Sequence, residues 1–278
     1  MKIWAIAANT YRKSVRNKTL IFMFLLSLFI IMFAPAFSFL DLVHATKVVK
    51  DVGLAATSLF GMLIGLFLAS TEIAGEVRDR TAHNVLAKPV TRLEFILGKF
   101  LGVLLVVLTA AGLMALFMCV AVVLAFRSGY TEDGGEIGLL RAASLAVANG
   151  DLSVALVRAI GLALVELAFV TGVASAFSAL TGSHIISLAA TALVYLLGHM
   201  NPGLRTIAAQ ADSAPLRLFM TGLLRVVPNL ARFNLRDEAV LNQMVLPWSK
   251  FWMSLGYGLL FTAFALVVGY LFFRRKEI

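Results

Sequence analysis

The sequence predicts an all-α, polytopic membrane protein with six transmembrane helices, and three observations support this fold class. Hydrophobic residues make up 60% of the chain and charged residues only 14%, whereas a soluble domain carries about a quarter charged residues. Mean hydropathy is +0.92. Several apolar runs are continuous and reach the roughly 20 residues that a helix needs to cross a bilayer, without the alternation of barrel strands.

The net charge of +9 does not indicate a nucleic-acid partner, because the basic residues flank apolar runs and suit anionic lipid headgroups. The single cysteine, Cys119, lies inside an apolar run. The four histidines are scattered over different segments, without the spacing of a metal site. We therefore expect one transmembrane domain over residues 1–278, embedded in the lipid bilayer, with no metal and no bound nucleic acid.

The first 18 residues predict an amphipathic helix at the membrane surface. Apolar residues recur there at helical spacing, and four basic residues cluster just before the first long apolar run. That run, 20–40, is long enough to span, so we expect it to remain in the protein rather than to be cleaved as a signal. The six transmembrane helices are expected at residues 20–40, 52–71, 100–126, 155–180, 185–198 and 251–273.

The connections between these spans differ in character. Polar loops are expected at residues 41–51 and 127–151, and a tight turn at 181–184. Two pairs of glycines, Gly61 with Gly65 and Gly98 with Gly102, are spaced four apart and would let another helix approach closely. Residues 199–250 contain four prolines and an amphipathic stretch, 216–227, with Arg217 and Thr221 on one stripe. We expect there an extracytoplasmic helical or re-entrant segment.

Six spans place both termini on one side of the membrane. The first helix usually sets orientation, and Lys and Arg are slightly more numerous on the N-terminal side. We therefore expect cytoplasmic termini.

The stretch from residue 72 to residue 99 carries nine charged residues between two long apolar runs. Glu72, Glu76 and Arg80 share one face of a helix that would continue the second span, and a short helix is expected at 81–87. Pro89 would stop that helix. Thr91 and Glu94 then match a capping box at the start of the third span. The pattern predicts a helical hairpin that projects into the cytoplasm.

These residues resemble the signature of ABC-2 family transporter permeases. The resemblance rests on Arg80-Thr81, on Val85-Leu86-Ala87-Lys88-Pro89-Val90, on Arg92 and on Leu97-Gly98-Lys99. The six-span layout, the basic N-terminal segment, residues 228–233 and the basic C-terminal end are similar as well. The resemblance covers essentially the whole chain in layout, and most of its specificity comes from residues 76–99.

The resemblance implies that residues 81–88 form a coupling helix, which docks into a groove of a cytosolic ABC ATPase subunit. Because the sequence has no Gly-x-x-x-x-Gly-Lys-Ser/Thr loop, ATP and Mg are expected on that subunit, and this chain is expected to be non-catalytic and to bind no cofactor. The resemblance also implies a pairing with a second copy or a related permease, in a bacterial or archaeal plasma membrane. The residues expected to couple to the ATPase are Glu76, Arg80, Thr81, Val85, Leu86, Pro89, Arg92 and Lys99.

Glu166 is the one acidic residue well inside a predicted span, and such a carboxylate is costly enough to suggest a function. It could line a translocation path, or it could be a neutral group bonded within the bundle, with Arg158 as the nearest candidate partner. The leading function is that of an ABC exporter permease, whose substrate the sequence does not name. Two alternatives stay open: an ABC-coupled subunit that transmits force to an extracytoplasmic protein through residues 199–250, and a lipid-modifying intramembrane enzyme that uses Glu166.

Overall fold

The computed structural model describes residues 2–36, 45–78, 91–132, 137–210, 213–234 and 247–275, and these residues form helices and connecting turns without strands. Six of the helices are long and apolar enough to cross a membrane, which confirms the predicted fold class. They are α2 (Lys18–Phe33), α3 (Ala45–Arg78), α5 (Arg92–Glu132), α7 (Val154–Thr181), α8 (His184–Ala209) and α11 (Trp248–Arg275). The shorter helices are α1 (Lys2–Val15), α6 (Leu139–Ala148), α9 (Ala214–Val226) and the 3-10 turn η2 (Leu230–Phe233).

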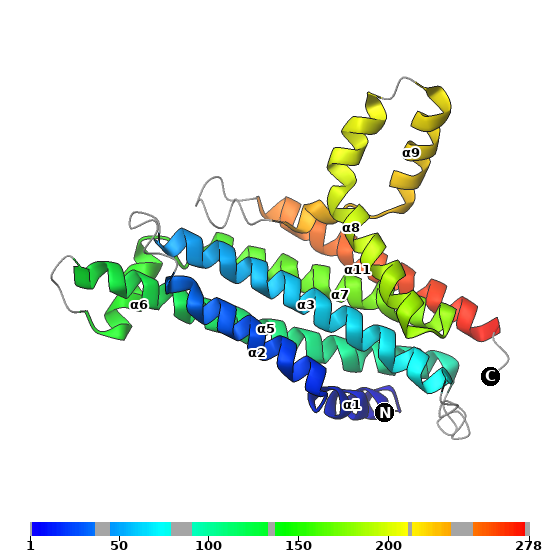
Figure 1. The fold of residues 1–278 in the computed structure, drawn as a ribbon, viewed down its shortest axis with the longest axis horizontal. Helices are drawn as coiled ribbons and strands as arrows, with labels where there is room; N and C mark the ends of the chain where they lie inside the picture. Colours follow the sequence, from blue (N-terminus) through cyan, green and yellow to red (C-terminus); the bar gives the residue numbers. More distant parts are fainter. Residues whose placement is uncertain are drawn as a thin grey trace.

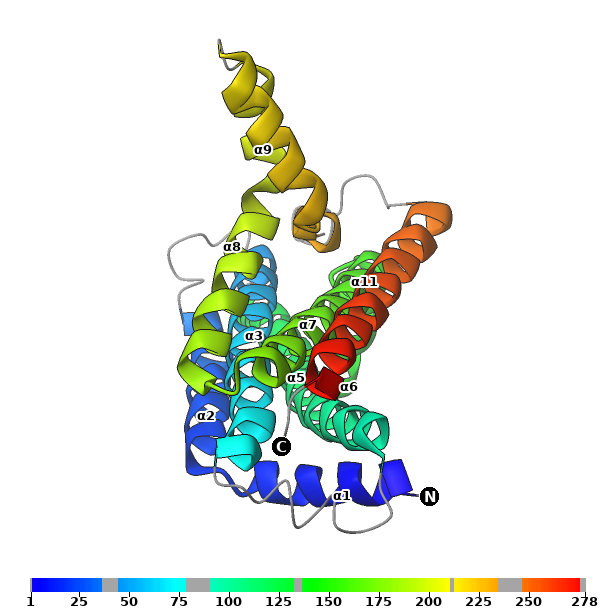
Figure 2. The ribbon, with the colours of Figure 1, turned by 90° about the vertical axis from the view of Figure 1, so that its right-hand side faces the viewer.

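Helix α7 lies in the middle of the bundle and packs against α3, α5, α8 and α11. The helices α2, α3, α5, α7 and α11 run along the long axis of the molecule (Figure 1). Helix α1 crosses one end of this bundle, and both chain termini lie near that end (Figures 1 and 2). We call this end the α1 end. The opposite end carries α6, and we call it the α6 end.

Small residues explain why α7 can hold this central position. Gly269 of α11 lies so close to α7 that an added Cβ would stand 2.8 Å from the Ala176 Cα atom. An added Cβ on Gly258 would stand 2.5 Å from Val165. Helices in a membrane gain packing contacts where small residues let their backbones approach, so these glycines fix α11 against α7.

Both predicted pairs of glycines lie at close helix contacts, as their spacing indicated. Gly61 and Gly65 of α3 face α7, where an added Cβ would stand 2.6 Å from Leu167 and 2.8 Å from Thr171, respectively. Gly98 and Gly102 of α5 face α1 instead. The α1 helix therefore rests on a groove in α5 that side chains at these two positions would fill.

Three helices extend past the ends that the sequence predicted, whereas the α-helix α2, predicted as part of a span at 20–40, ends at Phe33. Helix α3 begins at Ala45, although residues 41–51 were predicted as a polar loop. The reason is that Lys50, which is fully buried, pairs with Asp151 at 3.3 Å, and the Thr46 hydroxyl donates to the same carboxylate at 2.9 Å. A charge that is paired and hydrogen-bonded can be buried inside a helix. The prediction of a loop was therefore wrong for residues 45–51.

The other two corrections also lengthen helices. Helix α5 continues to Glu132, past the predicted end of its span at residue 126. Helix α8 continues through Pro202 to Ala209, past the predicted end at residue 198. The turn at Gly182 is as expected, with a φ of 66° that glycine adopts without strain.

The amphipathic stretch predicted at 216–227 is helical, as α9. The second half of α8 and the helix α9 form a hairpin that extends away from the bundle (Figure 1). The buried Asn201 of α8 holds this hairpin, because its side-chain amide donates to the Val227 carbonyl oxygen at 3.1 Å.

Candidate functional site

The helices on either side of residues 79–90 are α3 and α5, and the start of α5 has the predicted capping box. The Thr91 backbone amide donates to the Glu94 carboxylate at 2.7 Å, and the Glu94 amide donates to the Thr91 hydroxyl oxygen at 3.2 Å. These bonds satisfy backbone groups that a helix start leaves unpaired. Helix α5 therefore has a defined first turn where it leaves the 79–90 segment.

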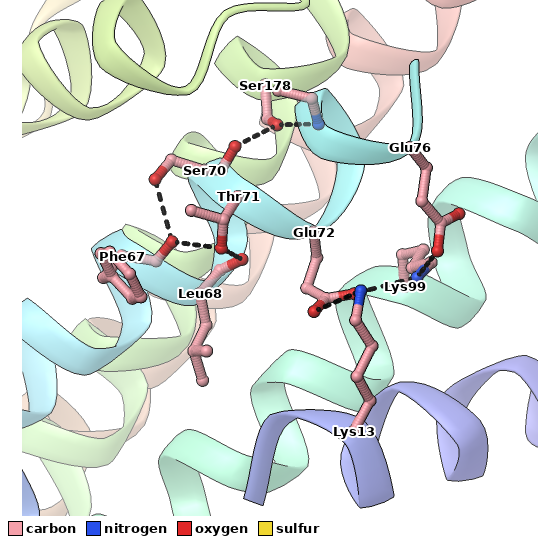
Figure 3. A network of polar contacts seen from close by, with 10 residues as sticks. Lys13, Phe67, Leu68, Ser70, Thr71, Glu72, Glu76, Lys99 and Ser178 are labelled. Carbon is pink, nitrogen blue, oxygen red and sulfur yellow. Dashed lines mark hydrogen bonds and ion pairs between the residues drawn. The ribbon is translucent and has the colours of Figure 1, made fainter. Parts of the chain in front are cut away.

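A buried ion-pair cluster joins the same two helices one to two turns further into the bundle (Figure 3). The Lys99 ammonium of α5 donates to Glu72 Oε2 at 2.9 Å and to Glu76 Oε1, both on α3. Lys13 of α1 also pairs with Glu72, at 3.2 Å. We call Lys13, Glu72, Glu76 and Lys99 the charge cluster.

The opposite charges of the cluster hold the ends of α3 and α5 together. Lys99 is only 3% exposed and Glu72 only 6%, so neither charge is well solvated. Two carboxylates face two ammonium groups, and this balance compensates the cost of burial. Removing one partner of such a buried set is typically expensive, about 3–5 kcal/mol, because a buried charge is left behind. The ends of α3 and α5 are thus held in a fixed relation.

Arg92 ties the same region to the last turn of α11. Its guanidinium donates to the backbone carbonyls of Phe273 at 3.2 Å and Arg274 at 2.8 Å. The ring of Phe273 stacks on Phe95 of α5, with 5.9 Å between centroids. A cation on the last carbonyls of a helix satisfies them and complements the helix dipole. The first turn of α5 and the end of α11 therefore form one unit.

Ser178 of α7 contacts the α3 backbone directly. Its hydroxyl donates to the Ser70 carbonyl oxygen at 2.8 Å and accepts from the Ala74 amide at 2.9 Å (Figure 3). In an ideal α-helix these two backbone groups, four residues apart, bond to each other. A hydroxyl between them is a known cause of local bending. Helix α3 is thus attached to the central helix just before Glu72.

Comparison with protein families decides which class of membrane protein this is. The family model described as ABC-2 family transporter protein matches residues 4–278. The chain belongs to the ABC-2 transporter family. It is accordingly a multi-pass, membrane-spanning permease subunit of an ABC transporter. A search of the curated proteins gave no match to the chain.

In this permease, three of the residues predicted to couple to an ATPase lie together at the α1 end. Glu76 and Lys99 belong to the charge cluster, and Arg92 lies at the start of α5. The predicted helix 81–88 lies outside the described residues, as do five of the predicted coupling residues: Arg80, Thr81, Val85, Leu86 and Pro89.

Sequence reasoning missed the partners that complete this site. The shared helical face of Glu72 and Glu76 was visible in the sequence, and it indicated one side of the charge cluster. Nothing in the sequence placed Lys13 or Ser178 beside these two residues. Lys13 is 59 positions away from its partner on α3, and Ser178 is more than 100 positions away from its partners there.

A second polar site of the permease surrounds Glu166 on α7. This residue is 5% exposed, and His199 Nε2 of α8 lies 3.4 Å from its Oε1 atom. Sequence reasoning named Arg158 as the nearest candidate partner, and the guanidinium of Arg158 stacks over the Trp248 ring at 3.8 Å. The contact with His199 was missed because histidines were considered only as metal ligands.

Proposed function

We propose that this permease is the membrane subunit of an ABC exporter, driven by a cytosolic ATPase subunit that binds and hydrolyses ATP with Mg. Residues 72–99 would receive the motion of that subunit, with 81–88 as the docking helix. The observation that carries the proposal is the buried contact of Lys99 with Glu72 and Glu76. Because it joins both helices that enter the 79–90 segment, a displacement of that segment would move α3 and α5 together.

Contacts of the described residues connect α3 and α5 to three further elements. Lys13 connects the charge cluster to α1, Ser178 connects α3 to the central helix α7, and Arg92 connects α5 to the end of α11. Packed helices and hydrogen-bonded contacts are the physical means by which a local displacement reaches distant elements. ATP-driven closure of the partner would thus rearrange several spans, and so move or extract a substrate.

The proposal includes an orientation and an assembly. The α1 end would face the cytoplasm of a bacterial or archaeal cell, with both termini on that side. A second copy of the chain, or a related permease, would complete the translocation path.

Co-purification with a phosphate-loop ATPase of the same cell tests the docking role. We expect Val85→Glu combined with Leu86→Glu to abolish the association while the protein still inserts into the membrane. Leu140→Glu is the matched control, because Leu140 is 87% exposed on α6 at the opposite end. Retention of both the ATPase and its activity in the double variant would show that residues 81–88 are not the docking helix.

A second candidate function is transmission of force to an extracytoplasmic protein without transport. The α8–α9 hairpin favours it, because Arg205 and Arg217 line one groove of about 270 Å³ on an element that stands off the bundle (Figure 2). Reversing both charges to Glu should then abolish an external association and leave basal ATPase activity unchanged. The same reversal of Arg141 on α6 is the control. Normal binding of the external protein by the Arg205/Arg217 variant would count against this candidate.

A further inference from the structure

A groove of about 710 Å³ lies between α1 and α5 at the α1 end of the molecule. Ligand sites in proteins commonly measure roughly 300–1,000 Å³, so the groove is large enough for an organic ligand. Two residues of α5, Leu105 and Thr109, form one wall, and five residues of α1 form the other: Trp4, Ala5, Ala8, Tyr11 and Arg12.

The position of the groove along α5 sets its depth in the membrane. Helix α1 crosses the end of the bundle (Figure 2) and packs on α5 at Gly98 and Gly102. Leu105 and Thr109 lie about one and two turns beyond Gly102, toward the α6 end. Because α5 is a membrane-spanning helix, the groove lies on the side of α1 that faces the bilayer interior. This is the depth at which lipid headgroups meet their acyl chains and at which an amphipathic surface helix rests.

The walls of the groove are apolar apart from one cation. Arg12 is the charged member among the described residues that line it. The Thr109 hydroxyl donates to the Val106 carbonyl oxygen of its own helix at 2.9 Å, so it needs no partner from a ligand. The rings of Trp4 and Tyr11 suit the boundary between headgroups and acyl chains. A ligand that fits these walls has an anionic group at one end and an apolar chain at the other.

We propose that this groove binds one anionic phospholipid, with its phosphate at Arg12 and an acyl chain along α5. A guanidinium donates paired hydrogen bonds to phosphate oxygens. Within the part of the chain that the structure describes, Arg12 makes no hydrogen bond or ion pair, so its donors are available. Beyond the groove, the exposed side chains of Leu113, Leu116 and Val120 continue at helical spacing along α5 and give the acyl chain an apolar surface.

The charges near Arg12 favour an anionic lipid over a zwitterionic one. Arg16 lies four residues further along the chain and is exposed. The nearby acid Glu72 does not cancel these charges, because its carboxylate is already paired with Lys13 and Lys99. A zwitterionic lipid brings an ammonium group, which the basic side chains repel, whereas an anionic lipid brings none.

The bound lipid also fixes α1 to α5, because it contacts both helices. A ligand that binds the folded state stabilises that state. Lys13 follows Arg12 directly and belongs to the charge cluster, so the lipid stabilises the contact of α1 with that cluster. Binding itself does not depend on an ATPase, and it can therefore hold or fail separately from the proposed function.

Native mass spectrometry of the purified permease, titrated in detergent with phosphatidylglycerol or with phosphatidylcholine of the same acyl chains, tests the site. We expect one tightly bound phosphatidylglycerol per chain, and phosphatidylcholine at least about fivefold weaker. Arg12→Gln should weaken phosphatidylglycerol binding by about fivefold and leave phosphatidylcholine binding nearly unchanged. Arg141→Gln is the matched control, because Arg141 is an exposed arginine on α6 at the opposite end, and this variant should keep the preference.

Filling the groove gives an independent test of the acyl-chain position. Ala8→Phe should weaken the binding of both lipids, whereas Ala148→Phe, at an exposed alanine of α6, should weaken neither. Equal affinity of the wild type for the two lipids would overturn the proposal, as would unchanged phosphatidylglycerol binding in Arg12→Gln. The same spectra report the number of chains per particle. If Ala8→Phe changed that number and left lipid binding at the wild-type level, the groove would belong to a contact between two copies of the chain.

Discussion

The ammonium group of Lys99 lies 2.9 Å from the Glu72 carboxylate, and this buried contact joins α5 to α3 on the two sides of residues 79–90. It lies within residues 72–99, which we propose to couple the permease to an ATPase, so its loss would affect both stability and the proposed coupling.

Replacing Lys99 with Met should destabilise the permease by about 3 kcal/mol, because the buried Glu72 and the partly buried Glu76 lose their common partner. Thermal or denaturant unfolding in detergent measures the loss. Lys13→Met is the control, since the side chain of Lys13 is 59% exposed and such a pair contributes at most about 1 kcal/mol. Equal stability of the two variants would contradict a buried, interdependent cluster.

Ser178→Ala should cost about 0.5–1.5 kcal/mol and should change hydrogen exchange at Ala74, whose amide donates to the Ser178 hydroxyl. Ser175→Ala is a closely matched control on the same helix, because the buried Ser175 hydroxyl donates to the Thr171 carbonyl of its own helix. That control should leave exchange in α3 unchanged. A similar exchange pattern in both variants would show that Ser178 does not hold α3.

The sequence predicted the class and the six spans because bilayer thickness sets the length of an apolar helix, and this signal is local. The capping box at Thr91 and the two glycine pairs were predicted for the same reason, since each depends on residues within a few positions. The start of α3 was harder to predict. Lys50 looked like a loop residue until its partner Asp151, 101 positions away, was known.

The pairings of the candidate sites needed the three-dimensional structure. Helix periodicity places Glu72 and Glu76 on one face, but it does not select Lys99 among the basic residues that flank the spans. The choice of His199 for Glu166 likewise depends on how α8 crosses α7. Polar residues in a membrane protein are rare enough to be noticed in a sequence, but their partners come from helices whose rotation is set by packing.

Gly102→Ala should displace α1 from its groove on α5. An added Cβ would lie 2.6 Å from the Thr10 Cβ atom and 2.7 Å from the backbone carbonyl oxygen of Ala7, and a backbone atom cannot move aside cheaply. We expect a loss of about 1–3 kcal/mol and faster proteolysis within α1. Gly112→Ala in the same helix meets nothing within 4 Å, so it should be neutral or stabilising by up to about 1 kcal/mol.

Arg92→Gln distinguishes two roles of Arg92: the contact with the ATPase that the family resemblance implies, and the contact with the end of α11 inside the permease. In the structure its guanidinium donates to the last carbonyls of α11, so the variant should speed hydrogen exchange in the final turn of that helix. We expect a stability loss on the order of 1 kcal/mol, because the site is only partly buried. Arg141→Gln, on the exposed face of α6, should leave both quantities unchanged. If Arg92→Gln weakened ATPase association and left exchange in α11 at the wild-type rate, the guanidinium would act on the partner rather than on α11.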